Sequence, residues 1–431
     1  MKTINKKPKI NIVTLGCSKN TVDSEVLSGI LSANGLDIHH QYKKDDYDSV
    51  IINTCGFIND AKEQSIDTIL EYVKAKKQGL IKKIYVMGCL SQRYKNDLIK
   101  EIPDVDKYYG VNNLKDILKD FGIQNNYNSP RLLSTPKHYA YLKIAEGCNK
   151  KCSYCAIPLI RGRHISRPME SIIDEAKMLV DKGVKEILLI SQDPTYYGMD
   201  LYKKQKITEL AGKISDIKDL SWLRLHYNFP SDLPDSLLDL IKDRKNICKY
   251  IDIPLQHISD NILKSMKRGV TKQETYKLIE KIKNRLPEAA IRTTFIVGYP
   301  GETEENFQEL KKFIKETRFD RLGVFTYSHE EGTYAGTLND DVPEEIKQAR
   351  AEEIMNIQQE ISYQNNLKLI GQNIKVLFDK IEGDAYIGRT EFDSPDVDNE
   401  VILPLKSKKI NIGEFSTVRI ESVGAYDLFA K

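Results

Sequence analysis

Residues 147–155 read Gly-Cys-Asn-Lys-Lys-Cys-Ser-Tyr-Cys and place Cys148, Cys152 and Cys155 on one short loop. Three thiolates with this spacing suit three corners of a cubic iron–sulfur cluster, which leaves the fourth iron open to a ligand. The competing interpretation is a zinc site, with His164 or a distant cysteine as the fourth ligand. The spacing favours the cluster.

The loop follows the first of six apolar stretches that alternate with helical patterns between Tyr139 and Ser328. The predicted strands cover residues 139–145, 185–190, 221–226, 249–254, 291–297 and 321–327. Six parallel strands are too few for the usual closed eight-stranded barrel, but they can curve into a partial one. We therefore expect the three cysteines at the carboxyl-end mouth, where such folds place their chemistry.

Three further cysteines, Cys17, Cys55 and Cys89, each end an apolar stretch in the first third of the chain. Alternating apolar and helical stretches over residues 8–125 predict a parallel α/β sheet with helices on its faces. Because the carboxyl ends of parallel strands meet at one edge, the three thiols can converge there. The alternative is a small buried side chain, which we expect for Cys248 because it has no partner nearby in sequence.

Other residues at the strand ends suggest a ligand site at the same mouth. Gln192 follows the second predicted strand of the barrel, and residues 296–302 read Ile-Val-Gly-Tyr-Pro-Gly-Glu at the end of the fifth. Glycines there would let the backbone approach a flat ligand closely. A turn leading into a helix, with Thr303 as its N-cap, explains the same residues without a ligand. Both interpretations stay open.

The composition is that of an ordinary globular protein with two or three domains, since 40% of the 431 residues are hydrophobic and 29% are charged. A formal charge of +3 provides no overall attraction to nucleic acid. The sequence shows neither a signal-peptide core nor an apolar stretch of membrane-spanning length, so we expect a cytoplasmic protein without a membrane partner. In a reduced compartment the seven cysteines are expected to be ligands or core residues rather than disulfides.

The last third begins with a charged helical pattern from Pro343 to about Leu369. After Gly371 the pattern changes to short strands separated by turn residues, which predicts a small β barrel. Residues 367–431 contain nine Lys and Arg residues and eleven Asp and Glu residues. This balance favours a positively charged protein, rather than RNA, as the partner of the module.

The two cysteine trios, the six-strand core and the terminal β module together resemble the methylthiotransferase family of radical S-adenosylmethionine (SAM) enzymes, over essentially the whole chain. The resemblance implies an α/β protein with three domains. These are an N-terminal domain over residues 8–125, a radical SAM core over 134–364 with a partial (β/α)6 barrel, and a TRAM-like barrel for substrate recognition over 366–431.

The resemblance also implies two 4Fe-4S clusters and SAM as cofactors. Cys148, Cys152 and Cys155 would hold the cluster that binds and reductively cleaves SAM, and Cys17, Cys55 and Cys89 an auxiliary cluster that carries the sulfur to be transferred. A second SAM would supply the methyl group. The implied SAM contacts are Tyr154, Arg161, Arg167, Gln192, Ile296, Gly298 and Glu302.

Within the family, residues 15–25, 53–58, 190–193 and 254–257 are most similar to the branch that modifies an aspartate β-carbon of small-subunit ribosomal protein S twelve. The branch that modifies an adenosine of transfer RNA shares the cysteines but matches these segments less well. A non-catalytic protein whose domains are joined by metal sites is the alternative of another class. The implied partners are ribosomal protein S twelve, a reducing donor such as flavodoxin or ferredoxin, and a source of sulfur.

Overall fold

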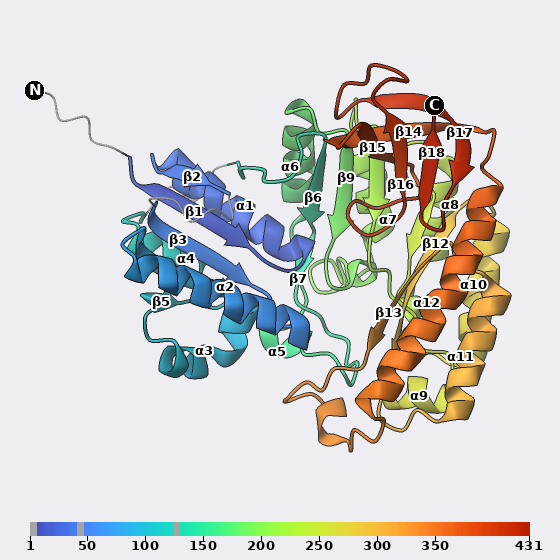
Figure 1. Ribbon diagram of the computed structural model, residues 1–431, viewed down its shortest axis with the longest axis horizontal. Coiled ribbons are helices and arrows are strands. Elements are labelled where there is room, and N and C mark those ends of the chain that lie inside the picture. The colour runs from blue at the N-terminus through green and yellow to red at the C-terminus, as the bar shows by residue number, and fades with distance from the viewer. Residues whose placement is uncertain (1–6, 41–46, 125–129) are drawn as a thin grey trace, which may run out of the picture. The chain divides into compact units, whose positions relative to one another are not determined.

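The structure is a computed structural model that describes residues 7–40, 47–124 and 130–431 (Figure 1). Its internal contacts divide the chain into two compact units, which are described separately. The first unit comprises residues 1–135, 146–149 and 156–163, and the second comprises 136–145, 150–155 and 164–431. None of the helices in the described residues has the length and apolar composition needed to cross a bilayer.

The first unit is built on a parallel sheet of five strands in the order β2-β1-β3-β4-β5. The strands are β1 (Lys9–Thr14), β2 (Asp37–His39), β3 (Tyr47–Thr54), β4 (Ile81–Gly88) and β5 (Lys107–Tyr108). The helices are α1 (Ser18–Ala33), α2 (Asn59–Lys77), α3 (Cys89–Glu101), α4 (Leu114–Asp120) and α5 (Ile157–Arg161). The predicted parallel α/β sheet is confirmed, whereas the edge strands β2 and β5 are too short to leave a periodic pattern.

The second unit contains six parallel strands in two groups of three, β10-β9-β6 and β11-β12-β13. The strands are β6 (Tyr139–Lys143), β9 (Glu186–Ile190), β10 (Trp222–Leu225), β11 (Tyr250–Asp252), β12 (Ala290–Val297) and β13 (Arg321–Thr326). A single parallel bridge between Leu223 and Ile247 connects the two groups just before β11. The six predicted strands are therefore present, and we call them the half-open barrel.

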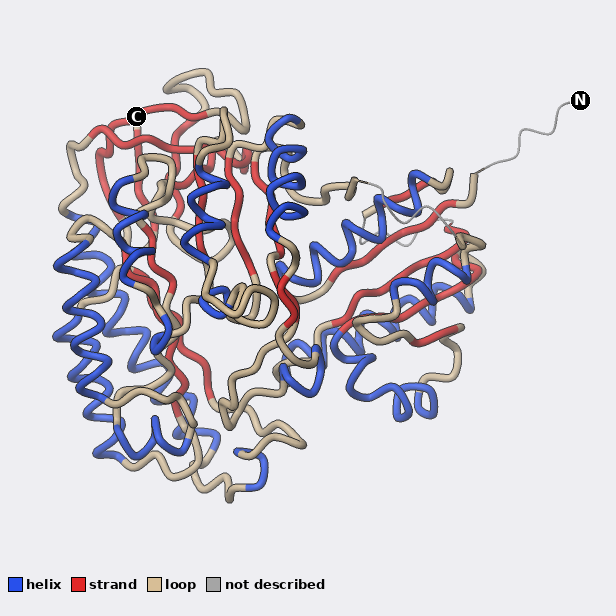
Figure 2. The backbone as a smooth tube through the Cα atoms, turned by 180° about the vertical axis from the view of Figure 1, so that it is seen from behind, coloured by secondary structure: helices blue, strands red, loops and turns tan. Residues whose placement is uncertain are grey.

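Helices surround the half-open barrel in both views (Figures 1 and 2). They are α6 (Met169–Asp181), α7 (Ile207–Ser215), α8 (Asp235–Asp243), α9 (Asp260–Ser265), α10 (Lys272–Arg285), α11 (Glu304–Thr317) and α12 (Glu344–Leu367). The predicted N-cap Thr303 accepts a hydrogen bond from the backbone N–H of Asn306 and starts α11. The predicted long helix is α12, which packs against β13. Two short strands, β7 (Ala145–Glu146) and β8 (Ile165–Ser166), pair beside the cysteine loop.

The chain ends in a closed barrel of five strands in the order β14-β15-β16-β18-β17. The strands are β14 (Asn373–Glu382), β15 (Ala385–Arg389), β16 (Glu400–Pro404), β17 (Phe415–Val423) and β18 (Asp427–Ala430). Four of these strands match the sequence prediction, and β18 was not predicted because it is four residues long and directly follows β17. We call this module the C-terminal barrel.

Buried ion pairs attach the C-terminal barrel to the half-open barrel, and we call this contact the seam. The Glu186 carboxylate lies 2.8 Å from Nε of Arg224 and 2.5 Å from Nη1 of Arg389, and Glu186 and Arg224 are fully buried. Arg389 belongs to the C-terminal barrel, whereas Glu186 and Arg224 lie on β9 and β10. One carboxylate therefore pairs with two guanidinium groups from different parts of the second unit, and Arg389 has a second carboxylate partner in Asp379 at 2.7 Å.

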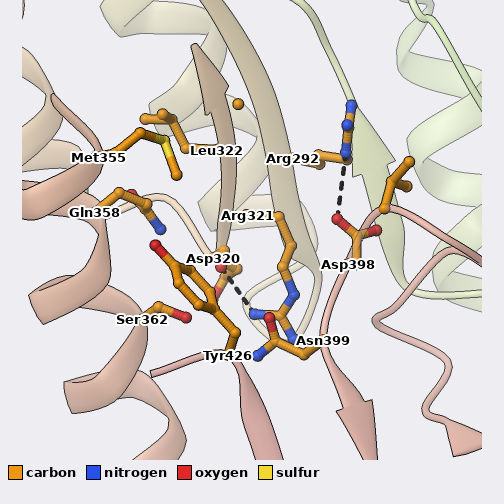
Figure 3. A pocket seen from close by; sticks show the side chains of 12 residues that line it. Arg292, Asp320, Arg321, Leu322, Met355, Gln358, Ser362, Asp398, Asn399 and Tyr426 are labelled. Carbon is orange, nitrogen blue, oxygen red and sulfur yellow. Dashed lines mark hydrogen bonds and ion pairs between the residues drawn. The ribbon is translucent and has the colours of Figure 1, made fainter. Parts of the chain in front are cut away.

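Two further pairs extend the seam, and one of them, Asp398 with Arg292, lines a polar cavity of about 190 Å³ (Figure 3). Asp398 lies 3.3 Å from Arg292, and Asp393 lies 2.5 Å from Arg321. Asp393 is 1% exposed, so this acidic group faces the half-open barrel rather than solvent. Arg292 and Arg321 of the same unit therefore balance the excess of two acidic residues in the C-terminal barrel. This excess was the reason to expect a positively charged protein as the partner of the barrel, so net charge no longer supports that expectation.

Candidate cluster and cofactor sites

The first unit brings Cys17, Cys55 and Cys89 to one edge of its sheet, because they follow the adjacent strands β1, β3 and β4. Cys17 is exposed, and the other two are buried. Burial raises the pKa of Cys55 and raises that of Cys89 to about 12, and the charge of Cys17 adds to both shifts. The thiols are thus close enough to influence one another electrostatically.

Two glycines allow the strand ends to approach each other closely. Gly16 has φ of +85°, and a Cβ on it would lie 2.7 Å from Cβ of Cys55. Gly88 has φ of +101°, and a Cβ there would lie 2.4 Å from Oδ1 of Asn53. Any other residue at either position would combine left-handed strain with a steric clash, so both glycines fix the turns that carry the cysteines.

Arg161 lies in the first unit with this trio. Its guanidinium donates hydrogen bonds to Oδ1 of Asn20 at 2.6 Å, to Asp23 at 3.1 Å and to Glu146 at 2.9 Å. Sγ of Cys89 lies 3.8 Å from the same Asn20 oxygen. The positive charge of Arg161 works against the effect of burial on the pKa of Cys89, so the structure places this arginine beside the predicted auxiliary site.

The donor set of three thiols suits iron–sulfur chemistry, because thiolates are the usual protein ligands of such clusters. None of the seven cysteines forms a disulfide. In residues 7–40, 47–124 and 130–431, no three His, Cys, Asp or Glu side chains surround a single point where one metal ion could bind. In a four-iron cluster each thiolate binds a different iron, so this chemistry does not require three donors around one point.

The 147–155 loop is fixed by backbone hydrogen bonds on both sides. In the first unit, the N–H of Cys148 donates to the carbonyl of Gly162 at 3.1 Å. In the second unit, Cys152 and Cys155 stand at the two ends of a turn closed by a 3.1 Å hydrogen bond, and Ser153 bonds to the carbonyl of Met266 at 3.0 Å. The turn that carries two predicted ligands is therefore tied to the segment after α9.

Arg268 lies against this turn, although nothing in the sequence singled it out. Its Nη1 donates to Sγ of Cys152 at 3.3 Å and to the hydroxyl of Tyr154 at 3.4 Å, and Nη2 donates to the carbonyl of Pro254 at 2.5 Å. Burial raises the pKa of Tyr154 well above its usual value, so the hydroxyl stays protonated. A contact between residues 116 positions apart leaves no local pattern that sequence analysis could find.

The carboxyl ends of the strands of the half-open barrel carry buried polar atoms that have no hydrogen-bond partner among the described residues. They are Ser191 Oγ, Asp193 Oδ2, Asn228 Oδ1 and His257 Nε2, which follow β9, β10 and β11. Burial raises the pKa of Asp193. His257 Nε2 lies 3.7 Å from the carboxylate of Glu302, and Asp193 Oδ2 lies 3.8 Å from the ammonium of Lys150, so neither pair is within hydrogen-bond distance. Buried polar atoms without hydrogen bonds are costly, so their concentration here suits a polar ligand such as SAM. The predicted contact Gln192 stands between Ser191 and Asp193 in the sequence and is half-buried.

The other predicted SAM contacts have different surroundings. Glu302 is engaged within the protein, because one oxygen accepts from the N–H of Gly298 at 2.7 Å and the other pairs with Arg350 at 2.9 Å. Ile296 and Tyr154 both pack against a small apolar cluster. Arg167 donates to the carbonyl of Lys143 at 2.7 Å and pairs with Glu175 at 2.6 Å. Gln192 follows β9 and Gly298 follows β12, so both stand at the carboxyl ends of strands of the half-open barrel.

Comparison with known proteins gives three consecutive family matches. The radical SAM superfamily matches residues 142–314, the uncharacterized protein family UPF0004 matches residues 9–110, and a TRAM domain matches residues 370–431. Together with the parallel sheet, the half-open barrel and the terminal five-stranded barrel, these matches define a radical SAM enzyme with two accessory modules.

Curated relatives narrow this class to one family. The chain is 53% identical over 429 residues to the ribosomal protein uS12 methylthiotransferase RimO of Bacteroides thetaiotaomicron, covering 99% of this chain and 98% of the relative. It is 53% identical over 428 residues to RimO of Christiangramia forsetii, covering 99% and 94% of the two chains. The chain belongs to the RimO family of radical SAM methylthiotransferases, as the sequence resemblance predicted.

A solved structure supports the fold independently. The radical SAM methyltransferase TsrM of Kitasatospora setae superimposes with a TM-score of 0.56, at 14% identity and with 77% of each chain covered. At this identity the similarity concerns the fold alone. It agrees with the half-open barrel seen here.

Proposed function

We propose that this protein methylthiolates the β-carbon of an aspartate in ribosomal protein uS12, the small-subunit protein S twelve. The observation that carries the proposal is 53% identity to RimO over nearly the whole of both chains. The six cysteines at the two candidate cluster sites support it, since both trios stand at the carboxyl ends of strands or on the loop after one. A ribosomal substrate would place the activity in the cytoplasm.

Two 4Fe-4S clusters and SAM would supply one-electron chemistry that no protein side chain can perform. Cys148, Cys152 and Cys155 would hold one cluster. The protein's own contribution is to bind and orient SAM with the polar atoms that follow β9, β10 and β11, and to keep water out with the surrounding apolar residues. Cys17, Cys55 and Cys89 would hold the auxiliary cluster in the first unit, on turns fixed by glycines.

Domain roles follow from this assignment. We propose an N-terminal domain over residues 8–125 for the auxiliary cluster, a radical SAM core over 134–364 and a C-terminal barrel over 366–431 that contacts the substrate. A low-potential electron donor such as flavodoxin or ferredoxin would provide the electrons, and a separate donor would provide the sulfur.

Replacing each cysteine trio by alanine tests the division of labour between the clusters. Each triple variant should lose half of the bound iron, from about eight to about four atoms per chain. The Cys148, Cys152 and Cys155 variant should form no deoxyadenosine from SAM. The Cys17, Cys55 and Cys89 variant should still cleave SAM under a strong reductant, yet transfer no sulfur. Full methylthiolation by the second variant would contradict the two-cluster proposal.

The substrate is tested by mass analysis of uS12 from cells that lack the protein and from cells in which it has been restored. We expect the mass of the methylthio group to be absent in the first and present in the second. Transfer RNA from the same cells is the matched control and should be unchanged. If uS12 were unmodified in both strains, and transfer RNA lost a methylthio group only in the cells that lack the protein, the protein would instead belong to the branch that modifies transfer RNA.

A further inference from the structure

Arg268 places a permanent positive charge beside one of the proposed cluster ligands. It lies between α9 and α10, is 4% exposed, and its Nη1 is 3.3 Å from Sγ of Cys152. A guanidinium remains protonated at every pH at which proteins are folded. Both residues belong to the second unit, so this contact lies within one compact body.

The orientation of Arg268 is fixed from two sides. Its Nη2 bonds to the carbonyl of Pro254 at 2.5 Å, and its guanidinium lies 4.3 Å from the ring centroid of Phe229. Lys150, which precedes Cys152 by two residues, places its ammonium 4.1 Å from the same ring. A cation over the face of an aromatic ring is attracted by the negative potential of that face, so the ring of Phe229 holds both cations near the turn.

The two cations differ in how their charge is balanced. Lys150 forms an ion pair with Asp232 and lies 3.8 Å from Asp193. Arg268 forms no ion pair with a carboxylate in the part of the chain that the structure describes, and its buried Nε has no hydrogen-bond partner there. The sulfur of Cys152 and the hydroxyl of Tyr154 are therefore the electron-rich side-chain atoms to which Arg268 donates.

We propose that Arg268 is a positioning residue that raises the reduction potential of the cluster held by Cys148, Cys152 and Cys155. This inference rests on the proposed function, in which that trio carries a 4Fe-4S cluster. Reduction adds one electron from the external donor, and no bond of the protein forms or breaks. A fixed cation stabilises the more negative, reduced state more than the oxidised state, and hydrogen bonds to ligating sulfur act in the same direction. Burial keeps water from screening the charge.

The test is a redox titration followed by electron paramagnetic resonance. Full-length protein with Cys17, Cys55 and Cys89 replaced by alanine is used as the parent, so that one cluster gives the signal. Arg268→Met should make reduction at least tenfold less favourable, which corresponds to 59 mV or more for a one-electron couple. Arg268→Lys keeps the charge without the planar fork and should recover part of the loss.

Lys267→Ala is the matched control, because Lys267 is exposed, adjacent in sequence and positioned over the ring of Tyr334 at 3.6 Å. Its potential should equal that of the parent. The inference would be overturned if an iron-loaded Arg268→Met protein had the same reduction potential as the parent. It would also be overturned if Arg268→Met bound less iron but the remaining cluster had an unchanged reduction potential. If Arg268→Met binds no iron, Arg268→Gln decides the question in the same titration. A parent without any cluster would instead contradict the proposed function.

Discussion

Replacing Glu186 should disrupt the seam, because its carboxylate pairs with two buried arginines. In Glu186→Gln, Arg224 would keep its charge without a carboxylate partner in the described residues, and Arg389 would keep only its pair with Asp379, although both arginines are at most 4% exposed. Removing one partner from a buried ion pair typically costs about 3–5 kcal/mol. With a slope of about 3 kcal/mol per molar urea, the unfolding midpoint should fall by at least about 1 M.

The protein contains a suitable probe at this place. Trp222 is the only tryptophan of the chain, is buried, and lies 4.7 Å from the ring of Phe415 on the C-terminal barrel. Its fluorescence should therefore report the separation of the two barrels during urea unfolding. Glu414→Gln is the matched control, since the carboxylate of Glu414 pairs with Lys185 across the same contact but is 57% exposed. That change should cost no more than about 1 kcal/mol.

The pH dependence provides a second readout with a defined sign. Burial alone would raise the pKa of Glu186, but Arg389 and Arg224 outweigh it and lower the pKa below its ordinary value. A carboxyl whose pKa is lowered in the folded state makes its full contribution to stability when the pH is above the pKa of the unfolded state. This contribution is lost as the pH falls through the pKa of the folded state. The wild-type protein and Glu186→Gln should therefore differ at neutral pH and converge in acid. Equal urea midpoints of Glu186→Gln and Glu414→Gln at pH 7 would refute the reasoning.

Three other substitutions test the sites. Gly88→Ala should destabilise the first unit by about 1–3 kcal/mol and reduce bound iron, because the new Cβ meets Asn53 at 2.4 Å. The control is Gly79→Ala, whose Cβ has open space, and this variant should retain its iron. Circular dichroism in urea measures the stability of the two variants, and iron analysis measures their metal content. Asp193→Asn should not lower the thermal unfolding midpoint at pH 7. Burial raises the pKa of this carboxyl, which means that its ionised form is disfavoured in the folded protein and that a neutral amide removes this cost. A clearly lower midpoint in calorimetry would contradict this. Phe229→Leu should cost about 1–4 kcal/mol in urea unfolding, because two cations lose their aromatic contact.

The strand ends were predictable from the sequence, and the contacts between distant residues were not. Apolar stretches followed by cysteine located β1, β3 and β4 and placed Cys17, Cys55 and Cys89 at a common edge. The pairing of Arg224 with Glu186 joins side chains at buried positions of apolar strands, where a sequence pattern predicts uncharged residues.

Arg161 illustrates the same limit on a smaller scale. The resemblance implied a contact between Arg161 and SAM, and this stays a prediction. The side chain bonds to Asn20 and Asp23, about 140 residues earlier, and these contacts left no local pattern in the sequence. Arg161 ends α5, which belongs to the first unit, while most of the radical SAM core belongs to the second.

The seam also determines how a partner would approach the C-terminal barrel. Asp379 and Asp393 pair with Arg389 and Arg321, and Asp398 pairs with Arg292. Setting aside these three acids and Arg389 leaves eight acidic and eight basic residues in residues 367–431. A surface with no net charge does not guide a basic protein over long distances, so collision should occur by unassisted diffusion at about 10⁵–10⁶ M⁻¹ s⁻¹. Recognition there would depend on shape after first contact, and the association rate would change little with ionic strength.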